Sequence, residues 1–128
     1  MKLLLDTHTF IWWDSEPTKL SVQVLALCQN RENMLLLSVA SIWEMQIKLQ
    51  LGKLKFSVPL KEIIETQQQT NNVKVLPVTL PHVLAVEKLP VYHKDPFDRL
   101  LIAQATVEEA VLVTGDPILT NYPVKVVW

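Results

Sequence analysis

The chain has 128 residues, of which 49% are hydrophobic and 20% are charged, and its formal net charge is −1 at pH 7. These values predict one globular domain over residues 1–128 with a full core, and they exclude a disordered chain. A net charge this close to zero also argues against strong nonspecific binding to nucleic acid.

Two further features limit the possible functions. The single cysteine, Cys28, cannot form an intramolecular disulfide, and no spacing of Cys and His indicates a zinc site. The apolar run at residues 2–5 stops at Asp6, and no later run approaches the roughly 18 apolar residues that span a bilayer. We therefore expect a cytoplasmic protein without a membrane partner.

The first half of the chain alternates short apolar runs with segments of helical periodicity. The apolar residues predict these elements in chain order: a strand at 2–5, a helical turn at 7–13, a helix at 21–30, a strand at 34–37 and a helix at 38–51. The continuous KLLL run at 2–5 is typical of a strand that is covered on both faces. Gly52 is placed to end the last of these helices, because glycine adopts the left-handed conformation without a steric penalty.

The second half repeats this alternation. Its predicted elements are a helix that opens at Pro59 and fades at 70–72, a strand at 73–76, a helix at 79–89, a helix at 95–109, a strand at 110–114 and a last strand at 124–128. Thr79 and Asp95 are expected N-caps, and each is followed by a proline in the first turn, where its missing N–H is harmless. Because strands that alternate with helices imply right-handed crossovers, we expect an α/β fold, a three-layer α/β/α sandwich with a mainly parallel sheet.

Four carboxylates are placed to meet near one edge of such a sheet. Asp6 follows the first strand and Asp116 follows the fourth, and ligands of open parallel sheets bind outside the carboxyl ends of the strands. Glu44 lies two turns into the helix after the second strand, so it must lean back toward this edge. Asp98 lies in the first turn of the helix at 95–109, and the local pattern alone does not place it at the same edge.

Each of these carboxylates also has a purely structural alternative. Asp6 and Asp116 could cap the turns that follow them. Ser41 and Glu44 fit a Ser-x-x-Glu capping box, and Asp98 could complement the helix dipole. A carboxylate has more acceptor sites than one N–H uses, so capping and metal binding are compatible.

The joint placement of the four acids favours a metal site. Carboxylates that cluster repel one another unless a cation sits among them. Carboxylate oxygens are the ligands of hard cations such as Mg²⁺ and Mn²⁺, and one or two such ions can activate a water and stabilise an in-line displacement at phosphorus. No Ser/His/Asp or Cys/His arrangement in the sequence competes with this interpretation. The pattern therefore predicts a metal site that suits a phosphodiester substrate.

Four segments resemble the PIN-domain family, and in particular the ribonuclease toxins of VapBC-type toxin–antitoxin pairs. They are LLLDTH at 3–8, LSVASIWEMQIK at 37–48, DPFDRLLIAQA at 95–105 and LVTGD at 112–116. The resemblance runs the length of the chain, and it becomes specific through the order and spacing of the four segments. It implies a three-layer α/β/α fold and Mg²⁺- or Mn²⁺-dependent endonucleolytic cleavage of RNA. It also implies a paired antitoxin that covers the site, and toxin homodimers.

The resemblance further assigns roles to individual residues. By position, Asp6, Glu44 and Asp98 match the three central acidic residues of the family, and Asp116 matches the fourth. Asp95 is an extra acid of this subgroup, with an expected role as a cap or as a contact to a metal ligand.

Three smaller assignments complete the predicted site. Ser38 and Thr114 resemble the small hydroxyl residues that the family places near the metal. Arg99 could contact the scissile phosphate or form an ion pair with a carboxylate. Gly115 departs from the family, in which this position often carries a side chain.

The general base of the reaction is not named by the sequence. His8 and His93 flank the proposed site, and a histidine pKa suits acid–base work, but a structural role for each is the alternative.

Two rival functions share parts of this pattern. A receiver-type signalling module is also a small α/β domain that holds Mg²⁺ with acids. It requires an acidic pair after the first strand and a phosphoacceptor Asp after a mid-chain strand, whereas Asp6 has no acidic neighbour and the strand at 73–76 ends in Pro77-Val78. A catalytically idle PIN-like binding protein is the other possibility, although the intact acidic set does not favour it.

Overall fold

The computed structural model describes residues 1–128 and contains a five-stranded parallel sheet. Its strands lie in the order β3-β2-β1-β4-β5, and every neighbouring pair is parallel. The bounds of the strands are Lys2–Leu5 for β1, Met34–Ser38 for β2, Lys74–Leu76 for β3, Val111–Val113 for β4 and Val126–Val127 for β5. The predicted strands are therefore all present, but the last is shorter than 124–128, because it pairs with β4 over two residues only.

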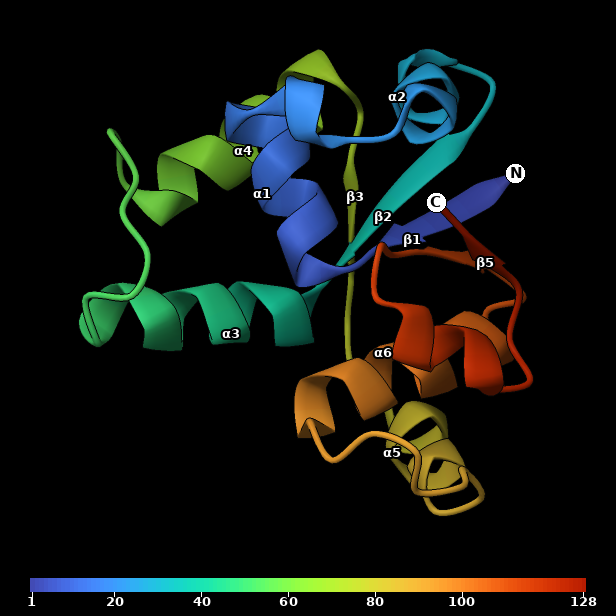
Figure 1. Ribbon diagram of the computed structural model, residues 1–128. Helices are drawn as coiled ribbons and strands as arrows, with labels where there is room; N and C mark the ends of the chain where they lie inside the picture. The colour runs from blue at the N-terminus through green and yellow to red at the C-terminus, as the bar shows by residue number, and fades with distance from the viewer.

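The chain has six α-helices, most of which cover the two faces of this sheet (Figure 1). Their bounds are Thr7–Ser15 for α1, Val22–Gln29 for α2, Val39–Gln50 for α3, Leu60–Thr70 for α4, Leu80–Val86 for α5 and Pro96–Val107 for α6. Short 3₁₀ turns lie at Pro17–Lys19 (η1) and Pro117–Asn121 (η2). In Figure 1, α1, α2 and α4 lie on one side of the sheet, and α5 and α6 lie on the other, whereas α3 extends away from the end of β2. None of these helices has the length and apolar character that crossing a membrane requires.

The central strands are apolar throughout because both of their faces are buried. The face toward α1, α2 and α4 buries alternate strand residues: Leu3, Leu5, Leu35, Leu37, Val111 and Val113. The face toward α6 buries the residues between them: Leu4, Leu36 and Leu112. This two-sided burial confirms the α/β/α sandwich that the continuous apolar runs predict.

The ends of the helices follow the local signals, with two corrections. Gly52 ends α3 with a positive φ of 71°, as expected. The predicted capping box of Ser41 and Glu44 is wrong: Ser38 caps α3 through the N–H of Ala40, and the buried Ser41 hydroxyl has no hydrogen-bond partner. Because Ser38 already ends the strand in extended conformation, the helix begins before Ser41 is reached.

The helix expected at 79–89 is also shorter than predicted. It ends at Val86, and residues 87–89 continue in tighter turns in which each N–H bonds to the carbonyl three residues back. At its start, Nδ1 of His82 accepts a hydrogen bond from the N–H of Thr79, so His82 takes the role that Glu plays in a Ser-x-x-Glu box.

The order of the strands creates a crevice between β1 and β4. The chain moves outward from β1 to β2 and β3 and then returns to the other side of β1 with β4. Ligands of open parallel sheets bind at such a switch point, outside the carboxyl ends of the strands. A receiver-type module has the order 2-1-3-4-5, so this topology contradicts the signalling alternative.

Candidate metal centre

Two of the four predicted acids come from the segments that follow β1 and β2. Asp6 directly follows β1 and caps α1, because its Oδ1 accepts the N–H of Thr9 at 2.8 Å. Glu44 lies on α3, and its Oε1 accepts a hydrogen bond from the Thr7 hydroxyl at 2.8 Å. Both carboxylates are buried. Since Thr7 is the first residue of α1, this contact draws Glu44 back to the edge where Asp6 lies.

The other two acids are joined by a histidine. Nε2 of His93 lies 3.1 Å from Oδ2 of Asp98 and 3.3 Å from Oδ2 of Asp116. Its Nδ1 accepts the N–H of Asp95, so the proton of a neutral ring lies on Nε2 and points at the two carboxylates. The ligand atoms of these three side chains all lie within 4.8 Å of one another.

Electrostatics links the two pairs of acids into one cluster. The pKa of Asp98 is raised from its usual 3.8 to about 7. Burial is the largest cause, the negative charges of Asp95 and then Asp6 follow, and Glu44 adds a smaller increase. The ring of His93 acts in the opposite direction. The negative charges that act on Asp98 therefore come from the caps of α1 and α6 and from α3.

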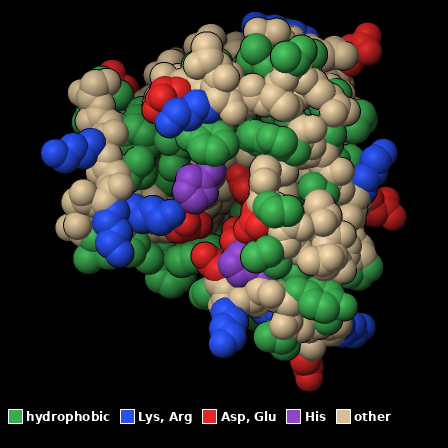
Figure 2. Space-filling model, in the orientation of Figure 1, with side chains coloured by type: hydrophobic (Ala, Val, Ile, Leu, Met, Phe, Trp, Pro, Cys, Tyr) green, Lys and Arg blue, Asp and Glu red, His purple; other side chains and the backbone are tan.

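The donor set fits a hard divalent cation. It consists of carboxylates, and the cations of the chain that contact it are Lys48, whose Nζ lies 2.8 Å from Oε2 of Glu44, and His93 when its ring is protonated. Carboxylate oxygens suit Mg²⁺ or Mn²⁺ better than softer metals. Figure 2 shows acidic side chains gathered in a hollow of the surface, with histidine and basic side chains around it.

Hydroxyl and carboxyl groups fix the start of three segments that carry an acid; the Ser38 and Thr114 hydroxyls are buried, and the Asp95 carboxylate is half-buried. Oγ of Ser38 accepts the N–H of Ala40, and Oγ1 of Thr114 accepts the N–H of Asp116 at 3.1 Å. Oδ1 of Asp95 accepts the N–H groups of Phe97 and Asp98, so Asp95 caps α6. In this structure Ser38, Asp95 and Thr114 position the backbone around the acids.

Arg99 lies apart from the cluster. Its guanidinium donates to the carbonyl oxygens of Pro90 at 2.9 Å and Val86 at 3.4 Å, and it forms no ion pair with a carboxylate. It therefore ties the segment after α5 to α6.

His93, an acid–base candidate at the flank of the predicted site, belongs to the cluster although it is not among the predicted ligands. It lies in the loop before α6, and the Tyr122 hydroxyl accepts the N–H groups of both Tyr92 and His93. Because Tyr122 follows η2, this contact fixes the loop against the segment that carries Asp116. In the sequence, the one indication of its place in the cluster is that it lies two residues before the Asp95-Pro96 cap. Many histidines with a purely structural role lie in loops of this kind.

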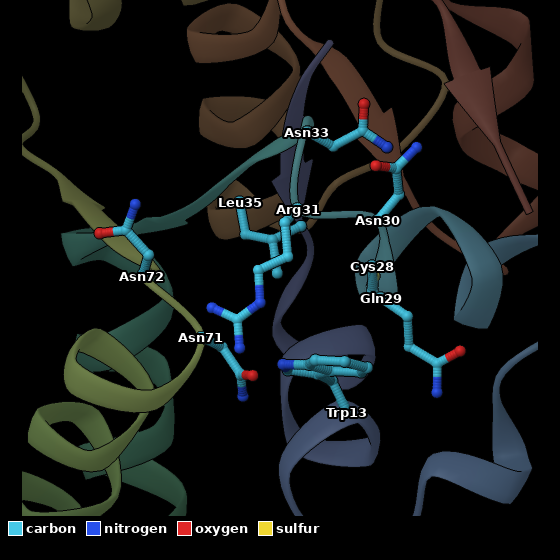
Figure 3. Close-up of a pocket in the computed structure, with 9 residues that line it drawn as sticks. All are labelled: Trp13, Cys28, Gln29, Asn30, Arg31, Asn33, Leu35, Asn71 and Asn72. Carbon is cyan, nitrogen blue, oxygen red and sulfur yellow. The ribbon is translucent and has the colours of Figure 1, made fainter.

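Two cavities differ in chemistry. One of about 470 Å³ adjoins the acids and is lined in part by Asp6 and Asp116. Another of about 360 Å³ lies at the other end of the sheet, where the loop before β2 passes α4 (Figure 3). Its polar lining is Arg31 and the amides Gln29, Asn30, Asn33, Asn71 and Asn72, without any carboxylate. The second cavity therefore lacks the carboxylates that would balance the charge of a hard cation.

Comparison with known proteins places the chain among proteins of one family. The family model described as the PIN domain matches residues 3–125. Ribonuclease VapC22 of Mycobacterium tuberculosis is 30% identical over 123 residues, which cover 94% of this chain and 91% of that protein.

Two solved structures share the fold at low sequence identity. VapBC2 from Rickettsia felis, bound to a DNA fragment from its promoter, superposes with a TM-score of 0.74 at 16% identity and covers 99% of this chain and 98% of that chain. DNA-bound VapBC from Salmonella typhimurium gives a TM-score of 0.70 at 16% identity, with 99% and 97% covered.

Proposed function

The chain belongs to the PIN-domain family, and we propose that it is a metal-dependent endoribonuclease whose residues 1–128 act as a single nuclease domain. The observation that carries the proposal is the convergence of Asp6, Glu44, Asp98 and Asp116 at the switch point of the sheet. The similarity to a protein named as a ribonuclease, over nearly the whole of both chains, supports the same reaction.

We assign the four carboxylates as the ligands of one or two Mg²⁺ or Mn²⁺ ions. Such an ion supplies an activated water and neutralises charge that develops on the phosphate. The chain itself orients the ligands: Thr7 and Lys48 each hold one oxygen of Glu44, and His93 bridges Asp98 and Asp116. Contacts of this kind fix the geometry of metal ligands.

The test of the proposal is RNA cleavage by the purified protein. Single-stranded RNA incubated with Mg²⁺ or Mn²⁺ is expected to be cut internally, and an excess of EDTA is expected to stop the reaction. An absence of cleavage with both ions, on RNAs of varied sequence, would contradict the nuclease assignment.

We also propose that the protein is the toxin of a toxin–antitoxin pair. The similarity of its fold to VapBC structures supports this role. Co-expression with the product of the adjoining gene is expected to yield a stable complex in which RNA cleavage is blocked. Light scattering of the same material tests the homodimer that the family implies.

Substitution of Thr7 by valine tests how Glu44 is held. Thr7→Val keeps the shape of the side chain but removes the 2.8 Å hydrogen bond to Glu44, so the Kd for Mn²⁺ is expected to rise roughly tenfold in calorimetric titration. The matched control is Thr9→Val, which also loses a buried hydroxyl on α1, but one that donates to the Val113 carbonyl. Equal Mn²⁺ affinity in wild type and Thr7→Val would show that Thr7 does not orient a metal ligand.

A further inference from the structure

The cavity of about 470 Å³ beside the acids has an aromatic wall, and we propose that it binds a nucleobase of single-stranded RNA next to the scissile phosphate. Its lining includes His8, Trp12 and Trp128, together with Lys19 and the backbone at Gly115. This inference rests on the proposed function, because it uses the four acids as the place where the phosphate lies.

The three rings offer faces on which a base can stack. The centroids of Trp12 and Trp128 lie 5.9 Å apart at an interplanar angle of 58°, and those of His8 and Trp12 lie 6.0 Å apart at 49°. Rings at such angles do not cover one another face to face, so ring surface stays open toward the cavity. Proteins that hold single-stranded nucleic acid stack bases on such aromatic side chains.

A glycine joins this wall to the acids. A Cβ placed on Gly115 would lie 3.0 Å from Cε2 of Trp128 and 3.2 Å from Cζ2, so the indole rests directly on the backbone of residue 115. That residue lies between Thr114, which accepts the N–H of Asp116, and Asp116 itself. The indole leaves little room for a side chain at residue 115, and the contact fixes the wall against the segment that carries Asp116.

The charge of the cavity suits a nucleotide. Nζ of Lys19 lies 5.8 Å from the centroid of the Trp12 ring, and its ion pair with Glu16 is exposed, with 3.3 Å between Nζ and Oε2. Exposed pairs contribute little, so this ammonium is available to a phosphate group. In RNA a base is joined to its phosphate through one sugar, so the two lie close together. The cavity and the acidic cluster share Asp6 and Asp116. An RNA whose phosphate lies at the acids therefore brings a base to the cavity.

The test compares two adjacent tryptophans. Trp12→Leu is expected to raise the Kd for a short, fluorescently labelled single-stranded RNA by roughly 5- to 100-fold in anisotropy titrations, because the stacking surface is lost. The titrations are run in EDTA and again with Ca²⁺. Trp13→Leu is the control, since Trp13 lies next in the same helix and directs its Nε1 to Gln67 at 3.0 Å. Trp12→Phe keeps a ring and is expected to bind nearly as well as wild type.

A second measurement uses the RNA instead of the protein, so it does not depend on how the variants fold. An RNA with an abasic site beside the scissile phosphate is expected to bind the wild type about as weakly as the intact RNA binds Trp12→Leu. The affinity of Trp12→Leu is expected to be nearly the same for the abasic and the intact RNA. Equal losses on the abasic RNA in wild type and Trp12→Leu would overturn the proposal. An RNA affinity of Trp12→Leu equal to that of wild type would also overturn the proposal. This holds too if Trp12→Leu no longer binds an antitoxin, since Trp12 would then contact a protein and not RNA.

The two proposals fail in different ways. If the wild type binds RNA in a way that depends on Trp12 but cuts none with Mg²⁺ or Mn²⁺, the nuclease assignment fails, and the cavity remains a site for a base beside a phosphate that is bound but not cut. If the wild type cuts RNA and Trp12→Leu cuts it with unchanged KM, the cavity is not a base site and the nuclease assignment stands.

Discussion

Asp98→Asn is expected to lower kcat for metal-dependent RNA cleavage at least about 100-fold while the fold survives. Loss of an outer contact to a metal ligand typically costs 10- to 100-fold, and loss of a ligand should cost at least as much. Asparagine keeps the size of the side chain but removes the charge that attracts the cation. It also removes a carboxyl group whose ionisation is opposed by burial and by Asp95, Asp6 and Glu44, so the free energy of unfolding should not fall.

Asp14→Asn provides the matched control. Asp14 lies on α1, outside the cluster, and accepts a hydrogen bond from the amide of Gln67 at 3.1 Å, which asparagine can also accept. Single-turnover cleavage of labelled RNA measures the rate, and thermal unfolding monitors the fold. Asp6→Asn is expected to behave like Asp98→Asn. Unchanged metal-dependent cleavage by either variant would refute the assignment of the site.

The metal-free protein is expected to lose stability as the pH rises from about 4 to about 7. Asp98 has a pKa of about 7 in the folded chain against 3.8 as its usual value, so in this range the folded state binds more protons than the unfolded state. The contribution of protonated Asp98 is complete below pH 3.8 and is lost as the pH passes through 7. One pKa unit corresponds to 1.36 kcal/mol, so the loss reaches at most about 4 kcal/mol.

The difference between wild type and Asp98→Asn isolates this effect, because every other titrating group is common to both. Urea unfolding in EDTA at several pH values measures it, and the stability of wild type relative to the variant should fall between pH 4 and 7. Mn²⁺ at pH 7 or above should restore the stability of wild type more than that of the variant, since a cation that binds only the folded state stabilises it. Parallel pH curves in EDTA would contradict the raised pKa.

Residues directly after strands were the most predictable part of the site. Asp6 and Asp116 follow apolar runs whose parallel pairing brings their ends together, and the capping bonds to Thr9 and Ile118 were equally readable. These features depend only on local pattern and on the shared direction of the strands. The α/β/α fold was predictable for the same reason.

Residues placed by tertiary contacts were less accessible. Glu44 reaches the edge through Thr7, which belongs to another helix, and the family resemblance rather than the spacing assigned it. Asp98 lies at the edge because α6 begins at the carboxyl ends of the strands and runs back to the start of β4. The local sequence does not indicate this direction of the helix. His93 sits in a loop fixed by the hydroxyl of Tyr122, so the contact that places it comes from a distant segment.

The order of the strands also determines when the protein can become active during synthesis. β1 is central in the sheet, but its neighbour β4 is made near the end of the sequence, so Asp6 meets Asp116 only after almost every residue has been translated. Such long-range pairing is slow to form. A nascent chain therefore lacks the complete acidic cluster until β4 pairs with β1. If the chain has the proposed toxin role, this interval gives an antitoxin time to bind the new molecule before it can cut RNA.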